Sequence, residues 1–481
     1  MTDRTTGFDR LATSALAVLG GSSVALLASL AVRVVAARVL GPSDLGLLLL
    51  GIAVVTAAGG AASLGLNSAT ARRGTELIAV GGEAGRGSTG RTALVVASLA
   101  GLGAALAVAG ISRLVQPDLG RVLLVLSPIT LALPVGAAVV GLSRSQGDVV
   151  VRAVLRDGAG GALRMVAVLL AVVLGGSLAA IAAGFAAGSV AAELLVVAYA
   201  IWMGWLAGGD WRRWDRTLLA GLPAFAFLEA FNQAGQWLDT VVLGALAPAA
   251  GVGFYGVARG LSRALQMVHQ AGAHRFLPEA TTALLAQNSL ELRRVLRRSR
   301  ALMFALYWPL AAPCLLAPHA TVTLFFGDAF VPAGDLLRVL ALGFAAEALF
   351  GYADLALVAA GRAAVVARVT MLSTGLGLAV MFFAVPRFGV AAAAFAMALS
   401  SLGRATALAV SLSHDTALKP WAAVATPAMG QSLLLTLGAA AVLHFGGVAP
   451  LASLAVIVTA AVAGSAVVAR DLLREPRRST G

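Results

Sequence analysis

The sequence predicts an all-α polytopic membrane protein. Hydrophobic residues make up 59% of its 481 residues and the mean hydropathy is +0.91, whereas soluble domains are about 45–50% apolar. About fourteen apolar stretches follow one another, each near the ~20 residues that a helix needs to cross a bilayer. The short polar loops between them are alternately rich and poor in arginine. These observations exclude a soluble fold and predict about 14 transmembrane helices.

Each expected span is an apolar run that ends at a polar, glycine-containing or proline-containing turn. The first run, 11–33, follows two arginines, as a secretory signal would. It is longer than a signal core of about 7–15 residues and a second run follows closely, so we interpret it as an uncleaved first helix. In chain order, the spans are expected at 11–33, 44–66, 92–112, 121–142, 157–175, 178–205, 218–246, 253–278, 301–325, 335–360, 365–385, 389–412, 421–445 and 451–469.

The basic residues indicate how these spans are oriented. If the N-terminus is cytoplasmic, the inner loops contain most of the 35 Lys and Arg residues, and the outer ends contain about five. The most basic loop, 279–300, would lie on the anionic inner surface of the membrane. This bias predicts a multi-pass protein of the cytoplasmic (inner) membrane with both termini cytoplasmic. It also accounts for the net charge of +13 without a nucleic-acid partner.

The turn after the first span has a counterpart after the seventh. The sequence around Pro42 resembles the sequence around Pro248, and both turns open the next span on the same side. An even number of spans separates the turns, so the repeat is parallel. It predicts two pseudo-symmetric six-helix lobes, at 1–217 and 218–412, followed at 413–481 by two C-terminal helices and a basic cytoplasmic tail.

Two adjacent spans each carry polar side chains along one face. On the span 218–246 these include Glu229, Asn232, Gln233, Gln236 and Asp239, and on the span 253–278 they include Arg259, Arg263, Gln266 and Gln270. A charge at a helix centre costs about 2.5–3.5 kcal/mol on insertion scales, so lipid is not the expected neighbour of either face. One interpretation is that the faces pair, with a salt bridge between Asp239 and Arg259. The other interpretation is a water-filled cavity that binds a polar substrate. This cavity would account for the polar residues of the two faces that are not part of the Asp239–Arg259 pair.

The repeat also relates two charged residues. Arg33 precedes Pro42 by as many residues as Asp239 precedes Pro248. Because equivalent positions of the two lobes then carry opposite charges, we expect Arg33 and Asp239 to face each other across a central cleft.

Other polar residues restrict the chemistry. Glu347 and Asp354 share one face of the span 335–360, where they would either couple a cation or proton to transport or make ordinary hydrogen bonds between helices. The single cysteine, Cys314, excludes an intrachain disulfide, and the five histidines lack metal-ligand spacing. The sequence therefore predicts no enzyme, no catalytic or metal site and no cofactor, and leaves coupling to H⁺, Na⁺ or the membrane potential open.

Four segments resemble one family of membrane proteins. They are RVLGPSDLG at 38–46, Asp239 with LG at 243–244 and VGFY at 252–255, LFFGDAFVPA at 324–333, and VPRFGV at 385–390. In this order, they resemble the polysaccharide flippases of the multidrug, oligosaccharidyl-lipid and polysaccharide exporter superfamily. The resemblance spans most of the chain.

The resemblance implies two six-helix lobes that open alternately to each side and flip a polyprenyl-diphosphate-linked oligosaccharide from the inner to the outer leaflet, for cell-surface polysaccharide biosynthesis. A diphosphate needs cationic partners, and an Arg guanidinium can hold two phosphate oxygens at once. The expected diphosphate-binding residues are Arg33, Arg259 and Arg263. The glycan would meet a polar cavity lined by Asn232, Gln233, Gln236, Gln266 and Gln270, and the candidate coupling or cavity acids are Glu229, Asp239, Glu347 and Asp354.

Two alternatives belong to related transporters. A cation-coupled multidrug antiporter of the same superfamily would favour acidic groups for its cargo, and a peptidoglycan-precursor lipid flippase would carry a similar lipid. The expected partners are the lipid-linked glycan, the lipid bilayer, a polysaccharide polymerase and glycosyltransferases, and no nucleic acid.

Overall fold

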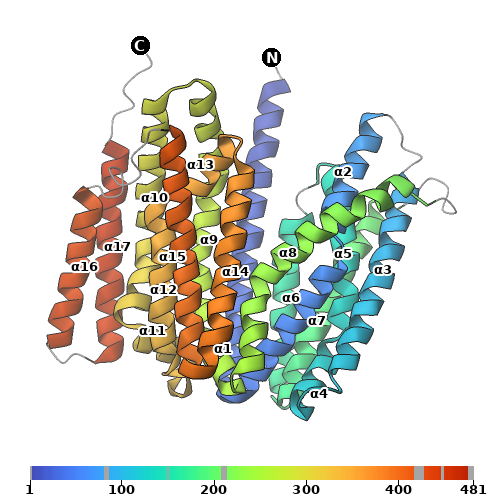
Figure 1. Ribbon diagram of the computed structural model, residues 1–481, viewed down its shortest axis with the longest axis horizontal. Coiled ribbons are helices and arrows are strands. Elements are labelled where there is room, and N and C mark those ends of the chain that lie inside the picture. The colour runs from blue at the N-terminus through green and yellow to red at the C-terminus, as the bar shows by residue number, and fades with distance from the viewer. Residues whose placement is uncertain are drawn as a thin grey trace. The chain divides into compact units, whose positions relative to one another are not determined.

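The computed structural model describes residues 3–80, 86–148, 151–206, 214–416, 427–445 and 449–474. Within these residues the chain is all-helical and contains no β-strand. The chain divides into two compact units, Met1–Gly253 and Phe254–Gly481. Figure 1 labels their helices. The first unit thus extends beyond the lobe boundary expected at 217/218, and the pseudo-symmetric lobes stay a prediction.

The first unit starts with two helices joined by a sharp turn. Helix α1 (Asp3–Ala62) contains one residue with non-helical dihedral angles, Gly41, at φ 72° and ψ 179°. This conformation suits glycine, and the following Pro42 lacks the N–H that a continuous helix would need. The turn therefore separates the expected spans 11–33 and 44–66, and the first helix runs on to this turn beyond the expected end at residue 33.

The other helices of the first unit are short where prolines or glycines interrupt them. Pro128 divides the expected span 121–142 into two helices, since a proline at the first helical position starts a new helix. The elements are α2 (Leu66–Ala79), α3 (Arg86–Ile111), α4 (Pro117–Leu126), α5 (Pro128–Ser145), the π-helix η2 (Val151–Ala159), α6 (Gly160–Val173), α7 (Leu178–Trp202) and α8 (Arg216–Leu246).

Small residues allow the helices of the first unit to pack closely. Helix α7 lies against α6 and α5, and η2 lies against α1. Gly184 and Gly188 of α7 have the GxxxG spacing of close helix pairs. A Cβ added at Gly188 would lie 2.6 Å from the Cα of Arg164 on α6, so glycine is required for this approach.

The two turns that resemble each other in sequence also contact each other. A Cβ added at Gly46 would collide with the carbonyl oxygen of Ala249, and a Cβ added at Gly253 would collide with the carbonyl oxygen of Pro42. The contacts are reciprocal, because the glycine after each turn meets a carbonyl of the other turn. They shift the alignment of the two turns by one residue from the alignment of Pro42 with Pro248.

The second unit is a bundle in which helices distant in sequence pack together, as well as helices that follow one another. It includes most of α9 (Ala249–Leu285), and α10 (Ser289–Leu316) contacts α12 and α17. Helix α15 packs between α12 and α14. The remaining elements are α11 (Pro318–Phe326), the short 3₁₀ helix η3 (Asp328–Phe330), α12 (Ala333–Phe350), α13 (Ala353–Ala359), α14 (Ala363–Phe388), α15 (Val390–Thr416), α16 (Pro427–Phe445) and α17 (Pro450–Arg474).

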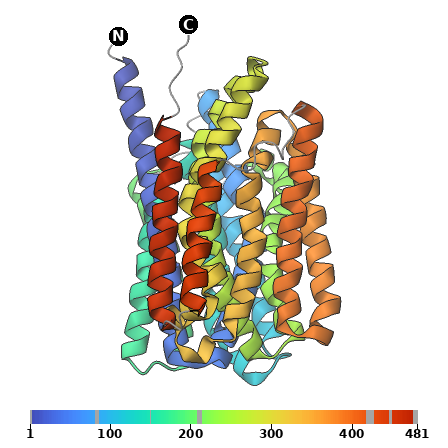
Figure 2. The ribbon, with the colours of Figure 1, turned by 90° about the vertical axis from the view of Figure 1, so that its left-hand side faces the viewer.

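The last two helices are integrated into the second unit. Helix α17 packs against α10 and α16, and Figure 2 shows α16 and α17 side by side, in red. Trp308 of α10 donates a hydrogen bond from Nε1 to Oγ1 of Thr436 on α16, at 3.0 Å. The two helices expected as a C-terminal addition are therefore held by a buried polar contact as well as by apolar packing.

We expect Trp308→Phe to lower the free energy of unfolding by about 1–2 kcal/mol, because phenylalanine keeps a six-membered aromatic ring but fills less of the buried space and cannot donate the hydrogen bond to Thr436. The measurement is equilibrium unfolding in mixed detergent micelles. Trp202→Phe is the matched control, since Trp202 is 78% exposed. Equal stability of the two variants would show that the Trp308–Thr436 hydrogen bond contributes nothing.

The structure confirms a helical membrane protein and corrects details of the expected spans. Eight helices among the described residues are long and apolar enough to cross a membrane. The described residues form 17 α-helices, because breaks such as Gly351 between α12 and α13 divide apolar runs. The number of membrane crossings, expected to be about 14, stays a prediction.

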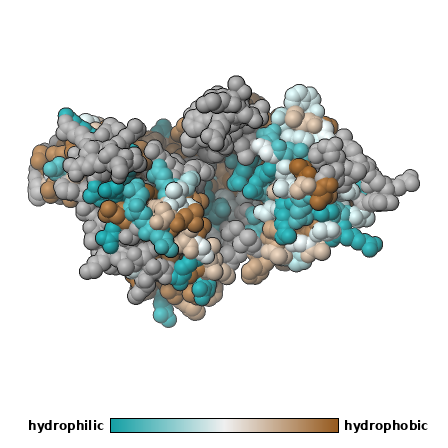
Figure 3. Space-filling model, turned by 90° about the horizontal axis from the view of Figure 1, so that it is seen from above, coloured by the Kyte–Doolittle hydropathy of each residue, from teal (hydrophilic) through white to brown (hydrophobic). Residues whose placement is uncertain are grey.

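The basic segment expected as a loop at 279–300 is mostly helical. Helix α9 continues to Leu285, and α10 already begins at Ser289. Asn288 stabilises this start, because its Oδ1 accepts a hydrogen bond from the backbone N–H of Glu291 at 3.0 Å. The arginines that follow are thus presented on helical turns. Figure 3, which views the helix ends drawn at the top of Figure 1, shows hydrophilic side chains, in teal, at this end of the second unit.

Candidate functional site

The structure places the expected cavity residues on several helices. Arg33 of α1 and Glu229 of α8 are half-buried, Gln236 of α8 is exposed, and Arg259 and Arg263 of α9 are half-buried. The side chains of five other expected residues lie outside the described part of the chain: Asn232, Gln233, Gln266, Gln270 and Glu347. The cavity that these residues would line stays a prediction.

Asp239 is buried in the first unit, with an exposed fraction of 2%. Its Oδ1 accepts a hydrogen bond from the backbone N–H of Thr240 at 2.7 Å. Asp354 of α13, the other described candidate acid, is half-buried. The Arg33–Asp239 and Asp239–Arg259 pairs that the sequence suggests stay predictions.

A buried ion pair joins two helices of the first unit. Arg156 lies on the π-helix η2, and Glu193 lies on α7. The Nε and Nη2 atoms of Arg156 donate to the same oxygen of Glu193, Oε1, at 2.9 and 2.8 Å. The exposed fractions of the two side chains are 21% and 8%. Both charges are thus removed from most of the solvent and neutralise each other.

The geometry of this ion pair leaves part of its bonding capacity unused. The edge of an Arg guanidinium matches the two oxygens of a carboxylate or a phosphate. Here the edge contacts one oxygen only, and Oε2 of Glu193 has no hydrogen-bond partner among the described residues. A buried polar atom without a partner costs about 1–3 kcal/mol.

A glycine on a neighbouring helix makes room for this carboxylate. A Cβ added at Gly136 of α5 would overlap Oε2 of Glu193 and would lie 2.6 Å from its Cδ. Glycine at this position lets the charged head of Glu193 lie against the backbone of α5. The space is therefore formed by three elements, η2, α5 and α7.

Other charged residues surround the Arg156–Glu193 pair. Asp157 and Arg152 on η2 approach to 4.0 Å, and Arg164 on α6 acts electrostatically on Glu193. Glu229 of α8, an acid expected from the sequence, acts electrostatically on Arg156. The first unit thus brings an expected cavity acid near a cluster of charged residues on η2, α6 and α7, which we call the η2 cluster: Arg152, Arg156, Asp157, Arg164 and Glu193.

The η2 cluster is not expected from the sequence, because Arg156 precedes the expected span 157–175 and would therefore lie in an inner loop. In the structure, the helix begins at Val151, as the π-helix η2. The sequence does contain an indication of a helix here. Arg152 and Arg156 are four residues apart, so they share one face of a helix, and most of the residues between them are apolar. π-Helical geometry is rare and is frequently found at functional sites, and the nine-residue π-helix η2 therefore draws attention to the η2 cluster.

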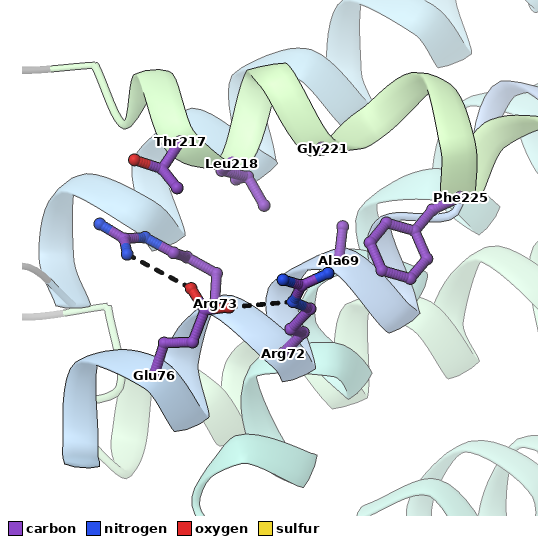
Figure 4. A pocket seen from close by; sticks show the side chains of 8 residues that line it. All are labelled: Ala69, Arg72, Arg73, Glu76, Thr217, Leu218, Gly221 and Phe225. Atoms are coloured by element: carbon purple, nitrogen blue, oxygen red, sulfur yellow. Dashed lines mark hydrogen bonds and ion pairs between the residues drawn. The ribbon is translucent and has the colours of Figure 1, made fainter.

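A second group of charged residues lines a small cavity between α2 and α8. The cavity has a volume of about 100 Å³, whereas ligand pockets are about 300–1,000 Å³. Figure 4 shows Ala69, Arg72, Arg73 and Glu76 from α2 opposite Thr217, Leu218, Gly221 and Phe225 from α8. Arg72 and Glu76 form an ion pair at 2.9 Å. The size of the cavity and its internal pairing indicate a helix contact more than a substrate site.

Asp215 fixes the neighbouring start of α8. Its Oδ2 accepts from Oγ1 of Thr89 at 2.6 Å and from Nε of Arg73 at 2.9 Å, and its Oδ1 accepts from the backbone N–H of Leu218 at 3.1 Å. Its own N–H donates to Oγ1 of Thr92 at 3.0 Å. Burial alone would raise the pKa of Asp215, but these hydrogen bonds and the charge of Arg73 outweigh burial and lower the pKa. Asp215 therefore joins α2, α3 and α8 as a carboxylate.

The described residues contain no group of three or more His, Cys, Asp or Glu side chains that could hold a metal ion. The η2 cluster instead combines three arginines with two acidic residues. Such a set is suited to bind a polar or charged molecule that passes through a helical bundle.

Comparison with known families decides the class of the protein. A model of the family described as polysaccharide biosynthesis protein matches residues 11–273, which is more than half of the chain. The chain belongs to this family. The match includes the η2 cluster and the candidate residues on α1, α8 and α9. Among curated proteins, no sequence matches this chain.

The fold of this polysaccharide biosynthesis family member is similar to solved transporter structures at low sequence identity. A lipid II flippase MurJ in an inward closed conformation gives a TM-score of 0.70 at 12% identity, covering 96% of this chain and 100% of that chain. An inward-facing multidrug resistance MATE family transporter of the MOP superfamily gives 0.69 at 14% identity, covering 82% and 94%. A MOP superfamily transporter from Pyrococcus furiosus gives 0.57 at 16% identity, covering 86% and 95%. These similarities show a MOP-like transporter fold.

Proposed function

We propose that the protein flips a polyprenyl-diphosphate-linked oligosaccharide from the inner to the outer leaflet of the cytoplasmic membrane, by alternating access, for cell-surface polysaccharide biosynthesis. The observation that carries this proposal is membership of the polysaccharide biosynthesis family in a chain with a MOP-like transporter fold. In the proposed architecture, about 14 transmembrane helices form two six-helix lobes and a C-terminal pair.

The distribution of charge supports a diphosphate-linked cargo. A diphosphate carries several negative charges and cannot enter a helical bundle without cationic partners. Arg33, Arg259 and Arg263 are half-buried within apolar helices, and Arg156 adds a guanidinium with an exposed fraction of 21%. Arginine binds phosphate oxygens through two parallel hydrogen bonds, which favours it over lysine at such a site. The lipid tail would remain in the bilayer, and the glycan would meet the polar face of α8.

Specific observations keep two other transport functions as alternatives. Glu229 and Asp239 on α8 and Asp354 on α13 could bind a cation, which favours a cation-coupled multidrug antiporter. The similarity of fold to a lipid II flippase over 96% of this chain favours a peptidoglycan-precursor flippase. In the proposed function, a glycosyltransferase supplies the lipid-linked glycan and a polymerase consumes it, with H⁺, Na⁺ or the membrane potential as the energy source.

Depletion of the protein from cells should cause an intact polyprenyl-diphosphate-linked glycan to accumulate in the inner leaflet. The measurement is mass spectrometry of extracted lipid-linked glycans, with an externally added glycosidase to test access from outside. The accumulated pool should resist the enzyme, because it has not crossed the membrane. An unchanged pool together with new sensitivity to cationic drugs would reject the proposal in favour of the antiporter. Loss of viability together with accumulation of a peptidoglycan precursor would instead favour a peptidoglycan-precursor flippase.

A further inference from the structure

We propose that Arg156 is a diphosphate-binding residue and that Glu193 occupies it when the substrate is absent, as an internal competitor that the diphosphate displaces. The inference rests on the proposed function, because it names the chemistry by which the same transporter holds its cargo. It adds to the expected set Arg33, Arg259 and Arg263 a residue on a different helix of the first unit.

The first argument is the mismatch between the two partners. The Nε and Nη2 atoms of Arg156 point to a single oxygen, Oε1 of Glu193, at 2.9 and 2.8 Å. The same edge could donate two parallel hydrogen bonds to two oxygens of one phosphate group, which is the stronger arrangement. A phosphate can therefore replace Glu193 on Arg156 with a gain in hydrogen bonding.

The second argument is the state of Glu193. Its side chain is 92% buried, since its exposed fraction is 8%, and Oε2 has no hydrogen-bond partner among the described residues. Gly136 provides the space into which this oxygen projects. Separating a buried ion pair is costly when a charge stays unpaired, so the exchange requires that phosphate takes the place of the carboxylate on Arg156 and that the displaced carboxylate is neutralised.

The third argument concerns the charges that remain after the exchange. Glu193 faces Arg156 and Asp157 on η2, Arg164 on α6 and the uncharged Gly136 on α5. Once Arg156 binds phosphate, Glu193 loses its nearest positive charge in a buried site. The carboxylate then takes a proton from the solvent and becomes a neutral carboxylic acid. Binding of one diphosphate is thus linked to the uptake of about one proton.

The decisive variant is Glu193→Gln, which keeps the size of the side chain against Gly136 and removes its charge. The test is isothermal titration of inorganic pyrophosphate into the purified full chain in lipid nanodiscs, in two buffers with different ionisation enthalpies. Glu193→Gln should bind pyrophosphate about tenfold more tightly than the unmodified protein, because the competing carboxylate is gone. The unmodified protein should take up about one proton more per bound pyrophosphate than Glu193→Gln.

Substitutions of Arg156 test the other partner. Arg156→Gln should weaken pyrophosphate binding about tenfold or more, since it removes the guanidinium. Arg156→Lys should recover only part of the affinity, because an ammonium cannot present two parallel donors. The matched control is Glu291→Gln, which removes a carboxylate from an exposed Arg–Glu pair at 3.2 Å on α10. This control should change neither affinity nor proton uptake.

The outcomes separate this inference from the proposed function. If Glu193→Gln leaves both pyrophosphate affinity and proton uptake unchanged, the competitor role of Glu193 is wrong, even if depleted cells accumulate the lipid-linked glycan. If Glu193→Gln tightens binding and abolishes the extra proton while depleted cells keep a normal lipid-linked pool, the anion site stands and the proposed cargo is wrong. A repeat with polyprenyl diphosphate in the nanodisc should give the same order of affinities.

Discussion

Gly46→Ala is expected to lower the free energy of unfolding by about 3 kcal/mol, because it forces apart two backbone segments that cannot adjust independently. The added Cβ would collide with the carbonyl oxygen of Ala249 and would lie 2.9 Å from the backbone nitrogen of Gly253. Both contacts are to backbone atoms of helix α9, so no side-chain rotation can relieve them. The measurement is equilibrium unfolding in mixed detergent micelles.

Gly103→Ala is the matched control for this substitution. Gly103 also lies inside a helix, α3, but an added Cβ would meet no atom within 4 Å. Because alanine is about 0.5–1 kcal/mol better than glycine inside a helix, Gly103→Ala should be neutral or slightly stabilising. If Gly46→Ala were as stable as Gly103→Ala, the close contact between the two turns would not contribute to stability.

Asp215→Ala should have a similarly large effect, about 3 kcal/mol, since it removes an ion pair, a helix N-cap and a hydrogen bond from Thr89 together. Its carboxylate is held by three elements of the first unit, at 2.6–3.1 Å. Asp215→Asn should be less destabilising than Asp215→Ala, because an amide oxygen can still cap α8. The free energy of unfolding of both variants is measured by equilibrium unfolding in mixed detergent micelles.

Low pH should reproduce, in the unmodified protein, part of the loss of stability expected for Asp215→Ala. The pKa of Asp215 is lower in the folded protein than its ordinary value of 3.8, so the folded state favours the charged form. The resulting stability is present above the unfolded pKa near 3.8 and is lost as pH falls through the lower folded pKa. Asp215→Asn should therefore show a weaker dependence of unfolding free energy on pH below about 4 than the unmodified protein.

Asp118→Ala provides the control for both experiments. Asp118 also pairs with an arginine, Arg121, but at 3.7 Å and with side chains that are 71% and 79% exposed. Exposed pairs contribute about 0–1 kcal/mol, so this variant should change stability little at any pH. An effect of Asp118→Ala as large as that of Asp215→Ala would show that burial and helix capping do not set the contribution of Asp215.

Much of the fold could be predicted because a bilayer leaves few choices to a chain. Long apolar runs must become helices, since no water is present to bind their backbone groups. The hydrophobic composition, the run lengths and the turn at Gly41–Pro42 therefore sufficed to predict a helical membrane protein and several helix ends. The family resemblance, which rested on short segments such as 38–46 and 252–255, is confirmed by the family match.

The ends of charged helices could not be predicted from the sequence. A span predicted from an apolar run ends at a charged residue. Arg156 is therefore expected in a loop, and 279–300 is expected outside the helices. In the structure, Arg156 lies in the π-helix η2, and its charge is neutralised there by Glu193, 37 residues later in the chain. A partner so distant in sequence is invisible to periodicity, which relates only neighbours on one helix.

Hydropathy and local turn chemistry act within single segments, so they are sufficient to identify a helical membrane protein, and short sequence motifs are sufficient to relate it to a polysaccharide biosynthesis family. Only the tertiary structure decided which charges meet. The contacts between Arg156 and Glu193, between Asp215 and Arg73, and between the turns at Gly46 and Gly253 depend on close packing of helices that are distant in sequence. Such packing is set by the shapes of whole helices and by the absence of side chains at a few glycines.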